Sequence, residues 1–166
     1  LAFAFFPSWV DMVVAAKIFI VVVWMGAGVS KLQHGFSSTV AIMVQNTPWN
    51  GFRKFRMATV RDFPNDIRPS KLTHLMAHVG GTTAEIVMPL VLLFSPWPWL
   101  TWIGIISMWM LHAFIISTIP LAVPLEWNVF FGFCAGFLFA NFPAGGGYGL
   151  GDMNTCLLYT SDDADE

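Results

Sequence analysis

Residues 9–29 read WVDMVVAAKIFIVVVWMGAGV, and this stretch decides the fold. Asp11 and Lys17 are its charged side chains. A helix of this length rises about 31 Å at 1.5 Å per residue, which matches the hydrocarbon thickness of a bilayer. Ser8 followed by Asp11 has the spacing of a helix-capping pair, so the helix is expected to begin there. The stretch therefore predicts a transmembrane helix.

Three further apolar stretches follow, at residues 72–94, 99–119 and 125–142. Each is about 27–35 Å long as a helix, enough to cross a bilayer. Pro89 lies inside the first of these three, where a helix breaker is tolerated because neighbouring groups satisfy the freed carbonyl. Residues 1–6 are also apolar and are interpreted as the remnant of an earlier helix. The predicted fold is all-α: a polytopic membrane helical bundle of four transmembrane helices plus that remnant.

The composition supports this class. The chain is 56% hydrophobic and 11% charged, whereas a soluble domain is normally about a quarter charged. A chain of 166 residues with so few charges has too little polar surface to cover itself in water. Six tryptophans are expected at the membrane–water interfaces because they lie near predicted helix ends. They are Trp9, Trp24, Trp49, Trp97, Trp99 and Trp127.

The basic residues predict the orientation. Seven of the eight fall between positions 31 and 71: Lys31, Arg53, Lys54, Arg56, Arg61, Arg68 and Lys71. The positive-inside rule then makes loop 32–71 cytoplasmic, in a multi-pass protein of the bacterial cytoplasmic (inner) membrane. We expect Arg53, Lys54 and Arg56 to contact anionic headgroups of the lipid bilayer. We expect no nucleic-acid partner.

The two ends of the chain look unlike the middle. Residues 1–155 are interpreted as a transmembrane helical domain, an internal fragment of a longer protein, because Leu1 begins inside an apolar run. Residues 156–166 resemble the translation of a sequencing adapter, so we interpret them as non-native and the chain as a metagenomic fragment. Without them, eight basic and six acidic residues remain, and the net charge changes from −2 to +2. Cys134 is then alone and is expected to be a small buried hydrophobe.

Lys17 and Glu85 lie at similar predicted depths in two different spans. Lys17 is eight residues from one end of its helix, and Glu85 is nine residues from the same side of the membrane. An unpaired charge at this depth is costly. We therefore predict a structural ion pair between Lys17 and Glu85, and a proton relay is a second interpretation of the same pair.

Four other polar residues are predicted to form one site near the cytoplasmic face. Lys31, His78, His112 and Glu126 each lie at or near a helix end on that side, and ionisable groups in a membrane are functional candidates. Each also has a structural interpretation: Lys31 reaching for headgroups, the histidines bonding between helices, and Glu126 capping its helix. His74, four residues before His78, could join the two histidines as a zinc or iron ligand, but without a His-Glu-x-x-His motif we predict no metal site.

Several short blocks, taken in order, resemble a bacterial, mainly actinobacterial, family of transmembrane proteins catalogued as a domain of unknown function. They include residues 27–32 (AGVSKL), 46–49 (NTPW), 61–64 (RDFP), 68–72 (RPSKL), 77–82 (AHVGGT), 85–87 (EIV) and 120–128 (PLAVPLEWN). The resemblance covers nearly all of residues 1–153. It implies a membrane topology and a longer parent protein, and it implies no activity.

A second, fainter resemblance concerns Lys31. Small residues followed by Lys31-Leu32 at a helix end, a Glu with a following Pro, and a His late in the third span are similar to the horizontally transferred transmembrane domain. That group includes the vitamin K-dependent γ-carboxylases. The resemblance implies that Lys31 is a base that takes a proton from a quinol, which a lysine desolvated at a membrane boundary can do.

Two functions remain open at this point. The first is a membrane-embedded enzyme acting on a lipophilic substrate, a quinone or a lipid, with Lys31 as base and His78, His112 and Glu126 lining the site. The second is a non-catalytic transporter or a scaffold subunit of an envelope assembly. An enzyme predicts that Lys31→Ala abolishes activity while the protein stays folded, whereas a scaffold tolerates that change. The sequence identifies no cofactor and no protein partner.

Overall fold

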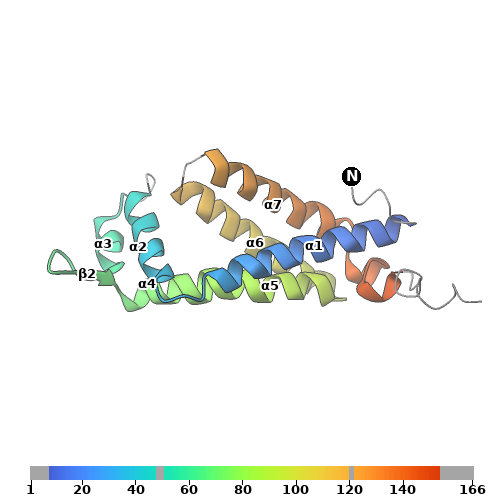
Figure 1. Ribbon diagram of the computed structural model, residues 1–166, viewed down its shortest axis with the longest axis horizontal. Helices are drawn as coiled ribbons and strands as arrows, with labels where there is room; N and C mark the ends of the chain where they lie inside the picture. Colours follow the sequence, from blue (N-terminus) through green and yellow to red (C-terminus); the bar gives the residue numbers. More distant parts are fainter. Residues whose placement is uncertain (1–7, 48–50, 120–121, 154–166) are drawn as a thin grey trace, which may run out of the picture.

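The computed structural model describes residues 8–47, 51–119 and 122–153. It confirms an all-α membrane helical bundle, built from four long helical segments that pack side by side (Figure 1). Helix α1 spans Trp9–Ser30, and the Ser8 hydroxyl accepts the Asp11 backbone N–H at its start, as the sequence predicted. The remnant proposed for residues 1–6 lies outside the described residues.

The second segment is continuous from Lys71 to Phe94 but is not one regular α-helix. It comprises α4 (Lys71–Leu75), the π-helical turn η2 (Met76–Thr82) and α5 (Thr83–Phe94). Where η2 meets α5, the hydroxyls of Thr82 and Thr83 donate to the carbonyls of Ala77 and His78, five residues earlier. A π-helical turn is a local irregularity that is common near functional sites.

Helices α6 (Pro98–Thr118) and α7 (Ala122–Ala140) complete the bundle. Two short 3-10 turns follow, η3 (Ala144–Gly146) and η4 (Leu150–Asp152). Among the described residues, α1, α4–α5 and α6 are each long and apolar enough to cross a membrane. Helix α7 adds a fourth span if it is counted together with the following turns, from which it is bent by 41°. The prediction of four spans therefore matches the upper of these two counts.

The part of the predicted loop 32–71 that the structure describes is itself folded. It contains α2 (Phe36–Asn46), α3 (Arg53–Ala58) and an antiparallel hairpin of β1 (Val60–Asp62) and β2 (Asp66–Pro69). These elements gather at one end of the bundle, which we call the basic end because it holds seven of the eight Lys and Arg residues (Figure 1). Helix α2 packs on the π-helical turn through Val40, Val44 and Ala77.

The main hydrophobic core lies where α1, α5, α6 and α7 meet, and it corrects one prediction. Trp24 is 1% exposed and packs in this core against the Phe131 and Phe139 rings, so it is not an interfacial tryptophan. Trp9, Trp97, Trp99 and Trp127 are all more than half exposed, while Trp49 lies outside the described residues. Cys134 is a buried free cysteine in the same core, as expected.

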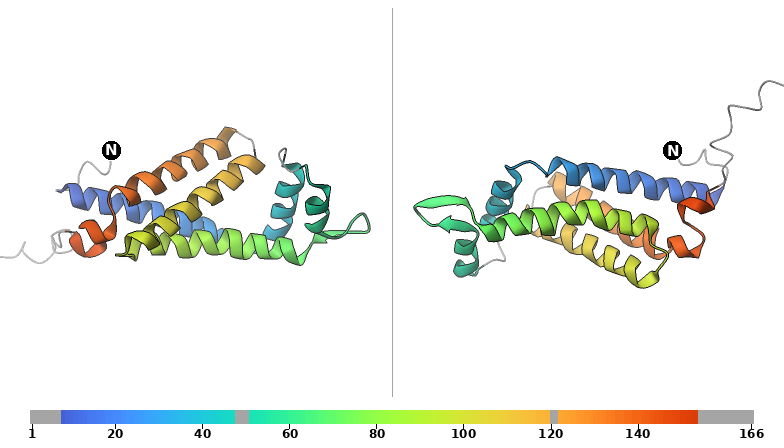
Figure 2. Two further views of the ribbon diagram at one scale, coloured as in Figure 1. Left: turned by 180° about the vertical axis from the view of Figure 1, so that it is seen from behind. Right: turned by 90° about the horizontal axis from the view of Figure 1, so that it is seen from below.

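Helices α1 and α5 are offset along the bundle axis. A Cβ atom added to Gly28 would lie 2.7 Å from Ile86 Cγ1 and 3.1 Å from Glu85 Cβ, so Glu85 lies at the level of Gly28. Figure 2 shows the consequence: the α4–α5 segment continues past the end of α1 at the basic end. Lys17, eleven residues before Gly28, is about 16 Å away from that level along the axis.

Candidate functional site

Lys31 and Glu85 form an ion pair at the basic end of the bundle. The Lys31 ammonium donates to both carboxylate oxygens of Glu85, at 2.5 Å each. Glu85 is 3% exposed, and the Lys31 side chain is 23% exposed, so the pair is largely shielded from solvent. The ammonium also lies 5.7 Å from the centre of the Phe36 ring on α2, a favourable cation–π distance.

The predicted pairing of Lys17 with Glu85 is therefore wrong. The depth argument assumed that α1 and α5 end at the same level, whereas the offset described above places Glu85 next to the last turn of α1. The Lys17 ammonium instead donates to the Tyr148 backbone carbonyl at 2.8 Å, and it interacts electrostatically with Asp152 and with the face of the Phe139 ring. Lys17 thus fixes the segment after α7 to the other end of α1.

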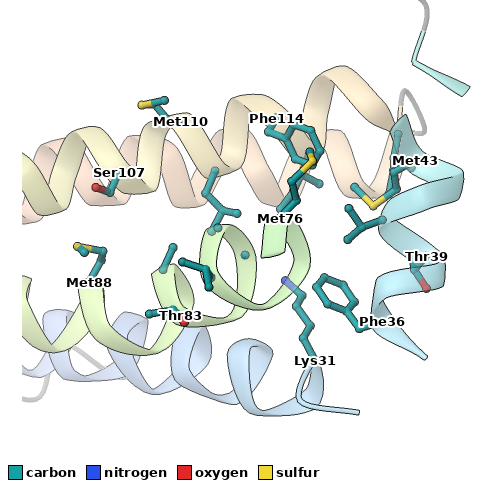
Figure 3. A pocket seen from close by; sticks show the side chains of 18 residues that line it. Lys31, Phe36, Thr39, Met43, Met76, Thr83, Met88, Ser107, Met110 and Phe114 are labelled. Carbon is teal, nitrogen blue, oxygen red and sulfur yellow. The ribbon is translucent and has the colours of Figure 1, made fainter. Parts of the chain in front are cut away.

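A cavity of about 670 Å³ lies beside the Lys31–Glu85 pair, between α2, the π-helical turn, α5 and α6. Figure 3 shows the Lys31 side chain extending toward it, beside the Phe36 ring and below Met76. Most of the lining is apolar, and four methionines contribute to it: Met43, Met76, Met88 and Met110. Among the described residues that line it, Lys31 is the one with a formal charge.

The cavity opens onto the outer surface of the bundle. Val79 and Met110 both line it and are 58% and 69% exposed, so its mouth lies between η2 and α6. In a membrane helical bundle this surface faces lipid. A lipophilic molecule could therefore enter from the bilayer and place its polar end near Lys31.

The histidines of the predicted site do not line this cavity. The Ser37 hydroxyl on α2 lies 2.8 Å from His74 Nδ1 and 3.2 Å from His78 Nε2, and the two imidazole rings stack with centroids 6.2 Å apart. The expectation that His74 and His78 share a helix face is confirmed. Ser37 is fully buried, and its role was not predicted.

His112 lies elsewhere, in the interior between α1, α6 and α7. It is 4% exposed, its Nδ1 is 2.8 Å from Asn128 Oδ1, and its ring is near the Trp24 and Phe131 rings. His112 therefore does not join His74 and His78 as a third metal ligand. Within the described residues, no group of three or more His, Cys, Asp or Glu side chains could hold a metal ion.

Glu126 is not brought to the cavity either. Its side chain is exposed, on the outer face of α7 together with Val129 and Phe130. Of the four residues predicted to share a site, Lys31 alone lines the cavity. His78 contacts Ser37 on α2, His112 is buried in the core, and Glu126 faces outward. Their helix ends share one half of the bundle, but their side chains point in different directions.

The cationic cluster on α3 divides into two kinds of residue. Arg53 and Lys54 are exposed. Arg56 is partly buried, and its guanidinium donates to the Thr47 carbonyl at 3.0 Å, which ties α3 to the end of α2. Arg68 forms a salt bridge with Asp66 on the exposed hairpin, with an N–O distance of 2.7 Å.

A family model described as a transmembrane protein of unknown function (DUF3556) matches residues 1–161. The chain belongs to this family. No curated protein and no solved structure matches it. Membership of a transmembrane family of unknown function was expected from the short sequence blocks.

The resemblance of Lys31 to the lysine of the γ-carboxylase group is not tested by these comparisons and stays a prediction. The segment 156–166 lies outside the described residues, and its interpretation as non-native also stays a prediction.

In this DUF3556 protein, two features of the site were missed from sequence. The first is the Lys31–Glu85 pair, for which the available signal was Gly28: a glycine one helical turn before Lys31 permits close approach of another helix. The second is Ser37, whose contact with two histidines depends on how α2 folds back. No local sequence pattern signals that contact.

Proposed function

We propose that this DUF3556 protein is a membrane-embedded enzyme whose substrate is a lipophilic molecule with a neutral polar head, of the quinone class, and that Lys31 is its base. The observation that carries the proposal concerns an apolar cavity that opens on the outer face of the bundle: in the part of the chain that the structure describes, Lys31 is the one charged side chain that lines it. Its volume of about 670 Å³ lies within the range of small-molecule sites, about 300–1,000 Å³.

The charge balance at the site favours a neutral head over an anionic one. Glu85 neutralises Lys31, so the pair has no net charge to offer a phosphate group. A quinone carbonyl or a quinol hydroxyl needs only a hydrogen bond from the Lys31 ammonium. The methionine-rich wall suits an apolar ring or chain of irregular shape, because unbranched thioether side chains adapt to their contacts.

The pair also supplies a route for a proton. When the Lys31 ammonium passes its proton to the Glu85 carboxylate, the neutral amine becomes a base at the cavity wall. It then takes the proton of a substrate hydroxyl, which leaves the substrate as an oxyanion beside the newly formed ammonium. Glu85 is a positioning residue in this scheme, because it contacts Lys31 and does not line the cavity.

We extend the proposal to the setting of the protein. Its location is a bacterial cytoplasmic membrane with the basic end on the cytoplasmic side, in accord with the clustering of Lys and Arg residues there. The exposed Arg53 and Lys54 are the residues of that end that contact anionic headgroups. Arg56 is excluded from this role by its bond to Thr47.

Binding is tested with a matched pair of glycine variants in lipid nanodiscs. Gly80 lines the cavity and Gly26 is exposed on α1, and a Cβ added to either meets nothing within 4 Å. Decylubiquinone titrated into Gly80→Leu is expected to bind at least about tenfold more weakly than to the wild type, or about 1.4 kcal/mol. Gly26→Leu is expected to bind like the wild type. Equal affinity in both variants would rule out this cavity as the site.

The base is tested with 4-nitrophenol that carries a long alkyl chain, since its phenolate absorbs visible light. The wild type is expected to increase the phenolate fraction of the bound probe at pH 7, and Lys31→Met is expected to bind the probe without doing so. If the probe binds but the wild type does not ionise it, the protein is a carrier or scaffold that binds lipophilic molecules without catalysis.

A further inference from the structure

Helix α2 forms one wall of the cavity, and it is the wall that does not belong to a membrane-spanning segment. Phe36, Val40 and Met43 face the cavity from this helix of eleven residues, which is too short to span a membrane. The other walls belong to the long helices. A displacement of α2 would therefore change access to Lys31 without disturbing the bundle core.

The Ser37 contact with His74 and His78 is the polar contact between α2 and the α4–α5 segment, beside the packing of Val40 and Val44 on Ala77. A serine hydroxyl has one proton to donate and can also accept. It can donate to one neutral imidazole nitrogen while it accepts an N–H from the other, and this arrangement survives protonation of either histidine alone. With both histidines protonated, both ring nitrogens are donors, and the serine proton has no acceptor among them.

Double protonation also places two positive charges on stacked rings with centroids 6.2 Å apart. The elements packed against α2 and the π-helical turn carry few groups that could offset them. Glu85 is paired with Lys31, and Asp66 is paired with Arg68. The other charged or titratable groups on these elements are Lys71 on α4, His112 on α6, and Asp11 and Lys17 on α1. Asp11 is the acid among them, and it lies in the first turn of α1, at the opposite end of that helix from the π-helical turn.

We propose that protonation of both His74 and His78 releases α2 from the α4–α5 segment and opens the cavity, so that acid pH promotes ligand entry and exit. The proposal rests on the proposed function, because it assigns regulation to the same cavity. Histidine side chains generally change charge between about pH 5 and 8, which sets the range to examine. Asp66 does not change charge in that range, because its hydrogen bonds with Arg68 lower its pKa to about 2.

The position of α2 is measured without ligand, by pulsed electron paramagnetic resonance in nanodiscs. Spin labels are attached at Ile42→Cys on α2 and Ile103→Cys on α6, in a chain with Cys134 and Cys156 changed to Ser. Both labelled side chains are exposed, at 62% and 45%. The distance between the labels is expected to lengthen and broaden from pH 7.5 to pH 5.

The control variants separate the two histidines from others nearby. His74→Gln with His78→Gln keeps amide hydrogen bonding but cannot gain charge, so its distance is expected to be the same at both pH values. His34→Gln, at an exposed histidine just before α2, is expected to respond like the wild type. Ser37→Ala is expected to show the longer distance at both pH values.

An unchanged distance in the wild type, or a full pH response in the double Gln variant, would overturn the proposal. Neither result bears on the proposed function, which is tested separately by decylubiquinone affinity at pH 7.5. If α2 moves as expected, decylubiquinone is also expected to associate faster at pH 5 than at pH 7.5 in the wild type. The double Gln variant is expected to lose that difference, and the same association rates in both proteins would overturn the link between α2 and the cavity.

Discussion

Gly28 on α1 lies directly against Glu85 on α5, and this contact determines which lysine pairs with the buried carboxylate. An added Cβ at Gly28 would come within 3.1 Å of Glu85 Cβ. Lys31 is three residues further on the same helix face, so close approach at Gly28 places its ammonium over Glu85. The ion pair at the cavity therefore depends on a residue without a side chain.

Gly28→Ala is expected to destabilise the protein by about 1–3 kcal/mol, because the new methyl group overlaps Ile86 and forces α1 away from α5. Unfolding in detergent mixtures of increasing denaturing strength measures this loss. Gly26→Ala is the control, since its added methyl group meets nothing within 4 Å. Equal stability of the two variants would mean that the helices are not in contact at Gly28.

A double-mutant cycle tests the corrected ion pair. Lys31→Met and Glu85→Gln are expected to show a coupling of about 0.5–3 kcal/mol in the free energy of unfolding, because the two side chains are in contact. The cycle of Lys17→Met with Glu85→Gln is expected to add to within about 0.5 kcal/mol. Coupling in the second cycle rather than the first would restore the pairing that helix depth alone suggested.

Trp24→Ala is expected to cost about 3–5 kcal/mol, because it leaves a large cavity in the core between α1 and α7. Trp99→Ala removes the same side chain at a position 63% exposed and is expected to change the free energy of unfolding by less than about 0.5 kcal/mol. The same unfolding measurement applies to both. A small effect at Trp24 would place this tryptophan at the membrane interface after all.

The exposed hairpin offers a pH prediction outside the membrane. The hydrogen bonds from Arg68 lower the pKa of Asp66 from 3.8 to about 2. Because the folded pKa is depressed, the contribution of Asp66 to stability is present above about pH 4 and is lost as the pH falls through about 2. Titration of the Asp66 carboxyl carbon by NMR is expected to show a midpoint near pH 2. Arg68→Gln is expected to return it toward 3.8, and Arg61→Gln to shift it far less.

Sequence periodicity and composition were enough to predict the membrane spans, but not how they pack along their axes. The predicted segment 72–94 corresponds to the continuous helix from Lys71 to Phe94, because an apolar run bounded by a basic loop and a proline turn has clear ends. The offset between α1 and α5 depends on side-chain contacts such as the one at Gly28. A comparison of helix depths that leaves out this offset pairs Lys17 with Glu85, which is the wrong partner.

The candidate site was predicted in part for a similar reason. Lys31 was identified because a charge at the end of an apolar helix is conspicuous. Depth along a helix says nothing about which way a side chain points around it, so Glu126 and His112 were grouped with Lys31 although one faces outward and the other inward. Ser37 carries no charge and lies in a loop whose fold could not be inferred from periodicity.

The bond between Lys17 and the Tyr148 carbonyl joins residues 131 positions apart. During synthesis, Lys17 leaves the ribosome in the first described helix, long before its acceptor exists. Until the turns after α7 are made, this ammonium has to be accommodated by water, by headgroups or by the insertion machinery. The bond that ties this part of α1 to the segment after α7 is therefore one of the last contacts to form in the assembly of this bundle.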